Sequence, residues 1–107
     1  MPRYLVETYI PRSRAGEARA AGRRITAIAE ELSREGTPVR YIRTTFLPDD
    51  ETCFHSFEAV SANAVEEVSR RAKLGRARVV RALESSRPAP RHERNEHAQD
   101  AFDDPWA

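Results

Sequence analysis

The segment Thr52–Ala59 places a thiol and an imidazole two residues apart, at Cys53 and His55. Cys53 is the only cysteine of the chain, and no other histidine precedes residue 92. Because alternate residues of a β-strand point to the same face, we expect both groups on one side of a strand. An imidazole can ligate a metal ion, transfer protons near neutral pH or serve as a hydrogen-bonded structural group. His55 is therefore the first candidate site residue, whereas a lone cysteine is more often a small apolar filler.

Glu7 is the second candidate, because it is a carboxylate in the middle of an otherwise apolar segment. Burying such a group is costly unless it is paired or bound to a metal ion. If the strands that carry Glu7 and His55 are neighbours, alternation predicts that both side chains lie on one face. The pair could then bind a divalent metal ion, act as a base with its orienting partner, or form a structural hydrogen bond at an interface.

Two tyrosines complete the predicted ligand-binding set. Tyr9 and Tyr41 are expected on the same face as Glu7 and His55, where their hydroxyl groups could donate hydrogen bonds to a ligand. Tyrosine is also common at protein interfaces, so a purely structural role stays open. The chain contains no glycine-rich phosphate loop, nucleophile elbow, paired-cysteine zinc motif or dinucleotide fingerprint. No catalytic residue is therefore assigned.

Alternating apolar residues and turn signals predict the elements that must position these side chains. Strands are expected where β-branched and aromatic residues alternate with polar ones, and helices where apolar residues recur at three- and four-residue spacing. Ser61 is a typical helix N-cap, and Gly36 is suited to end the preceding helix. In chain order the predicted elements are a strand over Arg3–Ile10, a helix over Gly16–Glu35, strands over Val39–Phe46 and Thr52–Ala59, a helix between Ser61 and Gly75, and a strand over Arg76–Glu84.

This β-α-β-β-α-β order predicts an α+β domain over residues 1–84. Two right-handed βαβ units joined by a hairpin give the ferredoxin-like arrangement, a four-stranded antiparallel sheet with both helices on one face. The first and third strands are then neighbours, which places Glu7 beside His55. By alternation, the helix-covered face is expected to carry Val6, Ile42, Phe54 and Val80. The open face is expected to carry Leu5, Glu7, Tyr9, Val39, Tyr41, His55, Phe57 and Leu83.

An open face with that many large apolar side chains is unlike the surface of a monomer. Large exposed apolar patches usually mark an interface or a ligand site. We therefore expect a homodimer whose two sheets face each other, a dimeric α/β barrel with a cavity between the sheets.

Residues 85–107 differ from the rest of the chain, because they contain no Ile, Leu, Val or Met and three of the seven prolines. Such a segment cannot bury enough apolar surface to order itself, which predicts a flexible tail. Its end carries Phe102 and Trp106 among acidic residues. These two aromatic side chains either belong to a frayed terminus or form a peptide that docks on a protein partner.

Charge and cysteine content narrow the function classes. The formal net charge of +1 over 107 residues gives no electrostatic case for nucleic-acid binding. A single cysteine cannot form an internal disulfide, which is typical of a reducing compartment and favours a cytoplasmic location. No apolar run is long enough for a transmembrane helix or a secretory signal, so no membrane partner is expected.

Four short stretches of the chain carry a family resemblance, namely Met1–Glu7, Pro48–Ala59, Ala64–Glu67 and Arg71–Leu74. Together they resemble a bacterial family of unknown function that includes a nickel-binding protein with a ferredoxin-like fold. The resemblance covers about the first 84 residues. It implies a dimeric α/β barrel and a site for nickel or another divalent metal, with Glu7 and His55 as candidate ligands.

Three functions follow as hypotheses. The first is a small cytoplasmic homodimer that binds a divalent metal such as nickel, or a small ligand, between facing sheets. The second is a cofactor-independent enzyme that acts on a small organic molecule in the same cavity, an analogy from fold alone. The third is a scaffold module whose C-terminal peptide recruits a partner.

Overall fold

The computed structural model describes residues 1–85 of the chain. In chain order it contains β1 (Arg3–Tyr9), α1 (Gly16–Arg34), β2 (Val39–Leu47), β3 (Thr52–Ala59), α2 (Ala62–Arg71) and β4 (Ala77–Ala82). A short 3₁₀ turn precedes α1 at Arg12–Arg14, and another joins β2 to β3 at Pro48–Asp50. The docking peptide predicted around Phe102 and Trp106 lies outside the described residues.

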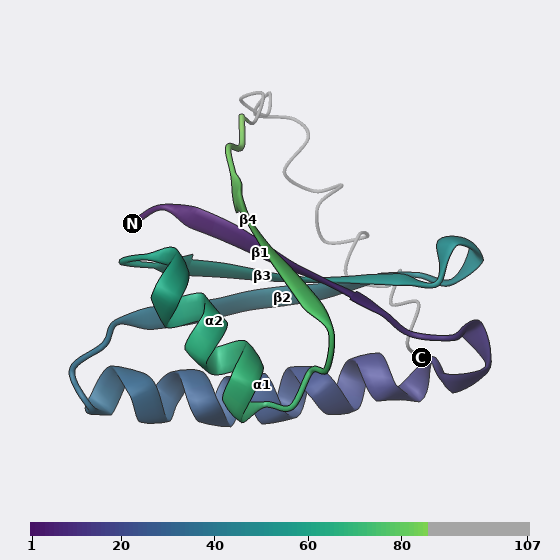
Figure 1. The fold of residues 1–107 in the computed structure, drawn as a ribbon, viewed down its shortest axis with the longest axis horizontal. Helices are drawn as coiled ribbons and strands as arrows, with labels where there is room; N and C mark the ends of the chain where they lie inside the picture. Colours follow the sequence, from purple (N-terminus) through teal and green to yellow (C-terminus); the bar gives the residue numbers. More distant parts are fainter. Residues whose placement is uncertain (86–107) are drawn as a thin grey trace, which may run out of the picture.

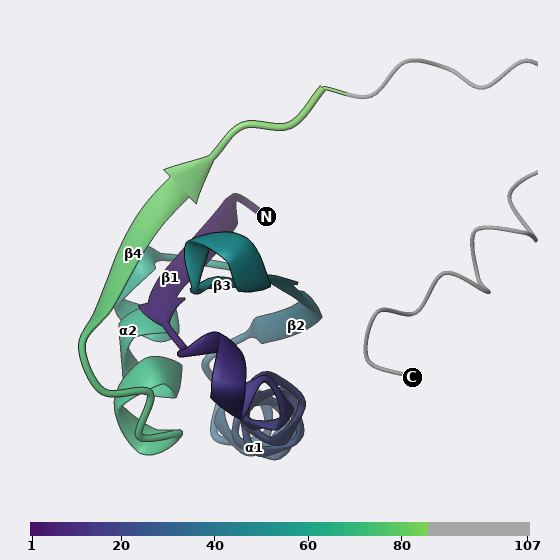
Figure 2. The ribbon, with the colours of Figure 1, turned by 90° about the vertical axis from the view of Figure 1, so that its right-hand side faces the viewer.

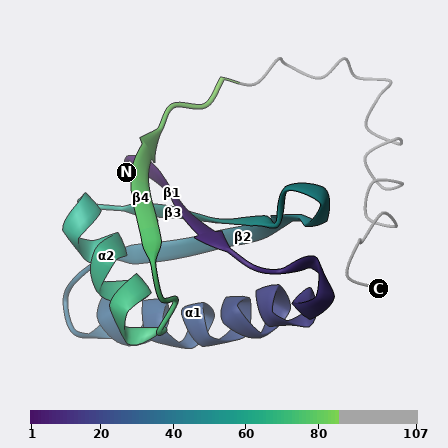
Figure 3. The same cartoon turned by 45° about the vertical axis from the view of Figure 1, so that its right-hand side comes forward.

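The four strands form one antiparallel sheet in the order β2-β3-β1-β4. Both helices lie on the same side of it (Figure 1 and Figure 2). Figure 3 shows α1 running along the β2 side and α2 lying near β4. The predicted α+β class and element order are confirmed, and the strand order is consistent with the ferredoxin-like arrangement. Neither helix of residues 1–85 is long and apolar enough to cross a membrane.

Local signals explain where the helices begin and end. The Ser61 side chain accepts a hydrogen bond from the Ala64 backbone N–H at 3.3 Å, which caps α2 as predicted. α1 ends before Gly36, whose φ of +101° allows the Thr37 N–H to bond back to the Leu32 carbonyl at 2.9 Å. The corresponding position after α2 is held by Lys73, with a φ of +56°. The sequence had suggested Gly75 for that role, so this helix ends earlier than predicted.

The core fills the space between the helices and the sheet. Its fully buried apolar side chains come from every layer, and the largest are Val6, Ile25, Phe57, Val65 and Val68. A second, smaller cluster under the first half of α1 contains Ile10, Ala18, Phe46 and Cys53. The buried residues of α1 that face the sheet are small or branched, which lets the helix approach the sheet closely; they are Ala18, Ala21, Gly22, Ile25, Ala29 and Leu32.

The face assignment of residues on three strands, β2, β3 and β4, is the reverse of the one predicted. In the β1–β3 pair, Val6 lies opposite His55 and Glu7 lies opposite Phe54. Directly opposed residues share a face, and Val6 is fully buried under the helices. Four side chains predicted on the open face therefore lie on the helix-covered face, namely Val39, Tyr41, His55 and Phe57.

Two side chains predicted under the helices lie on the opposite side of the sheet. Phe54 shares that side with Glu7, and Val80 pairs with Leu5. We call this side the uncovered face, because no helix of residues 1–85 packs on it. It carries Leu5, Glu7, Tyr9, Phe54, Ser56 and Val80. Leu5, Glu7 and Tyr9 were assigned correctly, whereas Leu83 follows the end of β4 and is 89% exposed.

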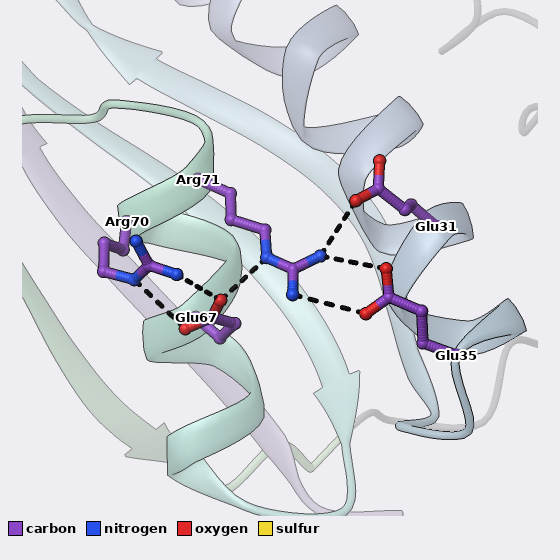
Figure 4. Close-up of polar contacts among 5 residues, drawn as sticks. All are labelled: Glu31, Glu35, Glu67, Arg70 and Arg71. Carbon is purple, nitrogen blue, oxygen red and sulfur yellow. Dashed lines mark hydrogen bonds and ion pairs between the residues drawn. The ribbon is translucent and has the colours of Figure 1, made fainter.

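An arginine of α2 ties the two helices together (Figure 4). Arg71 contacts Glu31 at 2.9 Å and Glu35 at 3.2 Å, both at the C-terminal end of α1. It also contacts Glu67 of its own helix at 2.7 Å. The Arg70 and Arg71 hydrogen bonds lower the pKa of Glu67 to about 2. Because acidic groups at a helix C-terminus are unfavourable, Arg71 offsets a local electrostatic conflict in α1.

Arg71→Ala is expected to lower the melting temperature more than Arg70→Ala does. Arg70 contacts only Glu67 within its own helix, whereas Arg71 bridges to α1. The difference should shrink in high salt, since exposed ion pairs are screened. Thermal unfolding followed by circular dichroism at low and high NaCl measures both effects. Equal losses for the two variants at low salt would contradict a role for Arg71 in holding the helices together.

Candidate functional site

The four predicted site residues form two separate pairs on opposite sides of the sheet. Glu7 and Tyr9 lie on the uncovered face, whereas Tyr41 and His55 lie under the helices. The expectation that Glu7 and His55 share a face is therefore wrong, although their strands are neighbours as predicted. A Glu7–His55 site within one chain has no geometric basis, because the sheet separates the two side chains.

A buried chain of hydrogen bonds runs through His55. Its Nδ1 lies 2.7 Å from the Thr44 hydroxyl oxygen, which also bonds to the Tyr41 hydroxyl. Its Nε2 lies 3.7 Å from the Cys53 sulfur, which also interacts with the Thr8 hydroxyl. A neutral imidazole donates through one ring nitrogen and accepts through the other, so these contacts satisfy both polar atoms of His55.

A β-bulge in β2 brings together the side chains of this hydrogen-bonded network. The β2–β3 register shifts between Tyr41 and Arg43, so Ile42 is an extra residue on the β2 side. Strict alternation would place Tyr41 and Thr44 on opposite faces, but the bulge brings them to the same one. Thr44 then lies directly opposite His55. Ile42 was predicted on the helix-covered face by strict alternation along β2, and the bulge interrupts that alternation at this residue.

Gly22 of α1 lies over the same chain of hydrogen bonds. A Cβ at this position would lie 3.0 Å from the Tyr41 hydroxyl oxygen and 3.4 Å from Oγ1 of Thr44. The glycine therefore leaves the room in which the Tyr41 hydroxyl reaches Thr44 beneath the helix. This close approach gives a physical reason for a residue that weakens an isolated helix by about 1 kcal/mol relative to alanine.

The titratable groups of this hydrogen-bonded network, His55, Cys53 and Tyr41, are in their neutral forms near pH 7. Burial, and secondarily the charge of Arg24, lower the pKa of His55 to about 4. Burial raises the pKa of the Cys53 thiol to about 11, and it also raises the pKa of Tyr41. Near neutral pH the pair is a thiol beside a neutral imidazole, not the thiolate that a cysteine nucleophile requires. The arrangement therefore fits a structural polar network better than a catalytic dyad.

On the uncovered face, Glu7 and Tyr9 line a shallow groove of about 260 Å³ at the end of β1. Arg78 of β4 lies opposite Glu7 in the register, and their charged groups are 3.9 Å apart. Glu51, Thr52 and Arg76 also line this groove. It offers two carboxylates, guanidinium groups and a phenol to a bound molecule.

Within a single chain, the donor groups of residues 1–85 do not assemble a nickel site. Within residues 1–85 no three side chains of the types His, Cys, Asp and Glu converge. Glu7 has a cation, Arg78, as its charged neighbour. Cys53 and His55 are fully buried, and both ring nitrogens of His55 are engaged. To bind Cys53 or His55, a divalent ion would have to break those contacts. It would also have to displace the proton of the Cys53 thiol.

Several residues of these sites carry no sequence signal that alternation could detect. Thr8 and Thr44 are ordinary strand residues, and Arg24 is one of many arginines in α1. Lys73 is the only lysine of the chain, which is a weak signal.

Comparisons of the chain with protein-family models, with curated proteins and with solved structures found no significant match, so function must be argued from the geometry.

Proposed function

We propose that this chain forms a homodimer through the uncovered faces of two sheets and binds a small polar ligand in the space between them. The observation that carries the proposal is the position of Leu5, Phe54 and Val80. They lie on three adjacent strands in the middle of a face that no helix of residues 1–85 covers. A second copy is the occupant with a matching face and the same extent of apolar surface.

The charged residues around this apolar centre support the proposal. Glu58 contacts Arg3 at 3.1 Å and Arg40 at 2.5 Å, and Arg3 also contacts Glu84 at 2.5 Å. These pairs lie at the end of the face that is remote from Tyr9 in the strand register. An apolar centre with a polar rim is the usual composition of a protein interface.

The ligand part of the proposal rests on the groove lined by Glu7 and Tyr9. Pairing of two uncovered faces would bring this groove to the edge of an enclosed space. Its charges of both signs favour a small organic molecule with hydrogen-bonding groups over a metal ion. The hypotheses of an enzyme and of a tail-dependent scaffold have no specific support from the described residues.

Phe54→Glu is expected to convert the dimer into a folded monomer at micromolar concentrations. The substitution places a charge in the centre of the proposed interface, where it would be desolvated without a partner. Multi-angle light scattering coupled to size-exclusion chromatography measures the mass, and circular dichroism checks that the variant folds. Val60→Glu is the matched control, because Val60 is an exposed apolar residue that lies in none of the four strands.

The control variant should keep the mass of the parent protein. A parent chain that is monomeric at these concentrations, or a folded Phe54→Glu variant that stays dimeric, would reject the pairing of uncovered faces. The ligand part is tested separately by a thermal-shift screen of small polar compounds. A compound that binds should raise the melting temperature of the parent protein in a saturable way and should not raise that of Glu7→Gln.

A further inference from the structure

A second pocket lies on the helix-covered side of the sheet, away from the proposed dimer interface. It has a volume of about 220 Å³ and lies between the first half of α1, the end of β1 and the turn after α2. His55 lines it from β3, and Thr8 lines it from β1. Two cationic side chains, Arg24 and Lys73, come from the helix and the turn. The pocket thus combines a hydroxyl and two positive charges in a small space.

Arg24 is held in place at this pocket. Its Nε donates a hydrogen bond to the Ala72 carbonyl at 3.0 Å, which links α1 to the end of α2. This contact uses one donor and leaves the terminal nitrogens of the guanidinium available. Its positive charge acts on His55, which lines the pocket, and contributes after burial to lowering the pKa of that imidazole. A guanidinium fixed by a backbone carbonyl is pre-organised to bind an oxyanion.

Lys73 occupies a backbone position that usually belongs to glycine. Its φ is +56°, and the turn around it is closed by a hydrogen bond from the Leu74 N–H to the Ser69 carbonyl at 3.2 Å. A side chain in this left-handed region is strained, and such strain is commonly kept where the side chain has a function. The side chain of Lys73, the only lysine of the chain, is exposed and lines both this pocket and a neighbouring surface pocket beside α2.

The positive charge of the pocket is not neutralised by the described residues. Glu17 is the only carboxylate that lines it, and Glu17 contacts Arg14 at 2.5 Å. Within residues 1–85 neither Arg24 nor Lys73 forms an ion pair. His55 is fully buried and both of its nitrogens are engaged, so the imidazole is a neutral floor. An anion would therefore meet two cations, while the one carboxylate of the pocket wall is paired with Arg14.

We propose that this pocket binds the phosphate or carboxylate group of a small molecule, held by Arg24 and Lys73, with Thr8 and His55 as neutral groups of the pocket wall. The volume admits an oxyanion with only a small organic part, since ligand pockets for drug-sized molecules begin at about 300 Å³. The site lies on the other side of the sheet from the dimer interface, so it does not depend on the proposed pairing of uncovered faces.

Lys73→Gly provides the central test, because glycine tolerates the left-handed backbone while the ammonium group is removed. The full chain is labelled with ¹⁵N and titrated with inorganic phosphate, and in a second arm with succinate, at constant ionic strength. Saturable shifts are expected at the backbone amides of Thr8, Lys73 and Leu74. Lys73→Gly and Arg24→Gln should each weaken binding by about tenfold or more, as expected for the loss of one charge-assisted contact.

Arg23→Gln is the matched control, because Arg23 neighbours Arg24 on α1 but does not line this pocket. Binding unchanged by both Lys73→Gly and Arg24→Gln overturns the proposal, and so do shifts that map elsewhere or an equal loss in Arg23→Gln. The two arms separate a phosphate-selective site from one that takes carboxylates. Absence of saturable binding to either anion rejects the site without bearing on the oligomeric state.

Discussion

Acidification from pH 7 to pH 4 is expected to lower the free energy of unfolding by about 3 kcal/mol through His55 alone. Burial of the imidazole, with a smaller contribution from the charge of Arg24, lowers the pKa of His55 from its ordinary 6.5 to about 4. Between these two values the unfolded chain binds a proton that the folded chain does not bind. The contribution is therefore complete above pH 6.5 and is lost progressively as the pH falls toward 4.

Urea denaturation at a series of pH values measures this loss, and the window between pH 5 and 6.5 is the most specific. Carboxylates such as Glu58 and Glu67, whose pKa values are lowered by arginine partners, begin to contribute only at lower pH. His55→Gln should flatten the slope in this window, since an amide does not titrate there. A variant that keeps the parent slope, or an imidazole that titrates near 6.5 when followed by NMR, would contradict the expectation.

The elements of this fold were predictable because their signals are local. The Ser61 cap depends on residues within one helical turn, and the end of α1 depends on Gly36. The order of strands and helices then restricts the topology, since right-handed crossovers leave few ways to arrange two βαβ units. None of these steps required knowledge of which side of a strand is buried.

Alternation could not predict which side of β3 is buried. A period of two divides the residues of a strand between two faces, but it does not say which face lies in the core. One set holds Cys53, His55, Phe57 and Ala59, and the other contains Phe54 and Glu58. Each set has a phenylalanine, so the choice depends on the remaining members. The set with Glu58 stays outside, because a carboxylate costs more to bury than a neutral imidazole whose two nitrogens find partners.

The polar sites were less predictable, because tertiary contacts create them. The bulge at Ile42 brings Tyr41 and Thr44 to one face, and no local residue pattern announced it. The pocket with Arg24 and Lys73 joins residues that are 49 positions apart, on a helix and on a turn. Gly22 was visible in the sequence as a glycine inside a helix, but only the approach of the Tyr41 hydroxyl explains it.

Phe57→Ala is expected to destabilise the protein by about 3–5 kcal/mol, the range for deleting a fully buried aromatic ring. Phe57 is fully buried under the helices, and its ring packs against that of Tyr41 with centroids 5.8 Å apart. Its removal leaves a cavity bordered by a close-packed sheet and helices, which cannot collapse freely. Urea denaturation of the variant gives the loss directly.

Phe54→Ala is the matched control, because it makes the same chemical change three residues away on the same strand. Phe54 lies on the uncovered face and is only partly buried, so its loss should be about 1 kcal/mol in the isolated chain. In the proposed dimer the cost of Phe54→Ala should also grow with protein concentration, because the side chain stabilises the associated state, whereas the cost of Phe57→Ala should not. The reverse ranking, with Phe54 the more costly residue, would restore the face assignment that strand alternation first suggested and would remove the uncovered face as a dimer interface centred on Phe54.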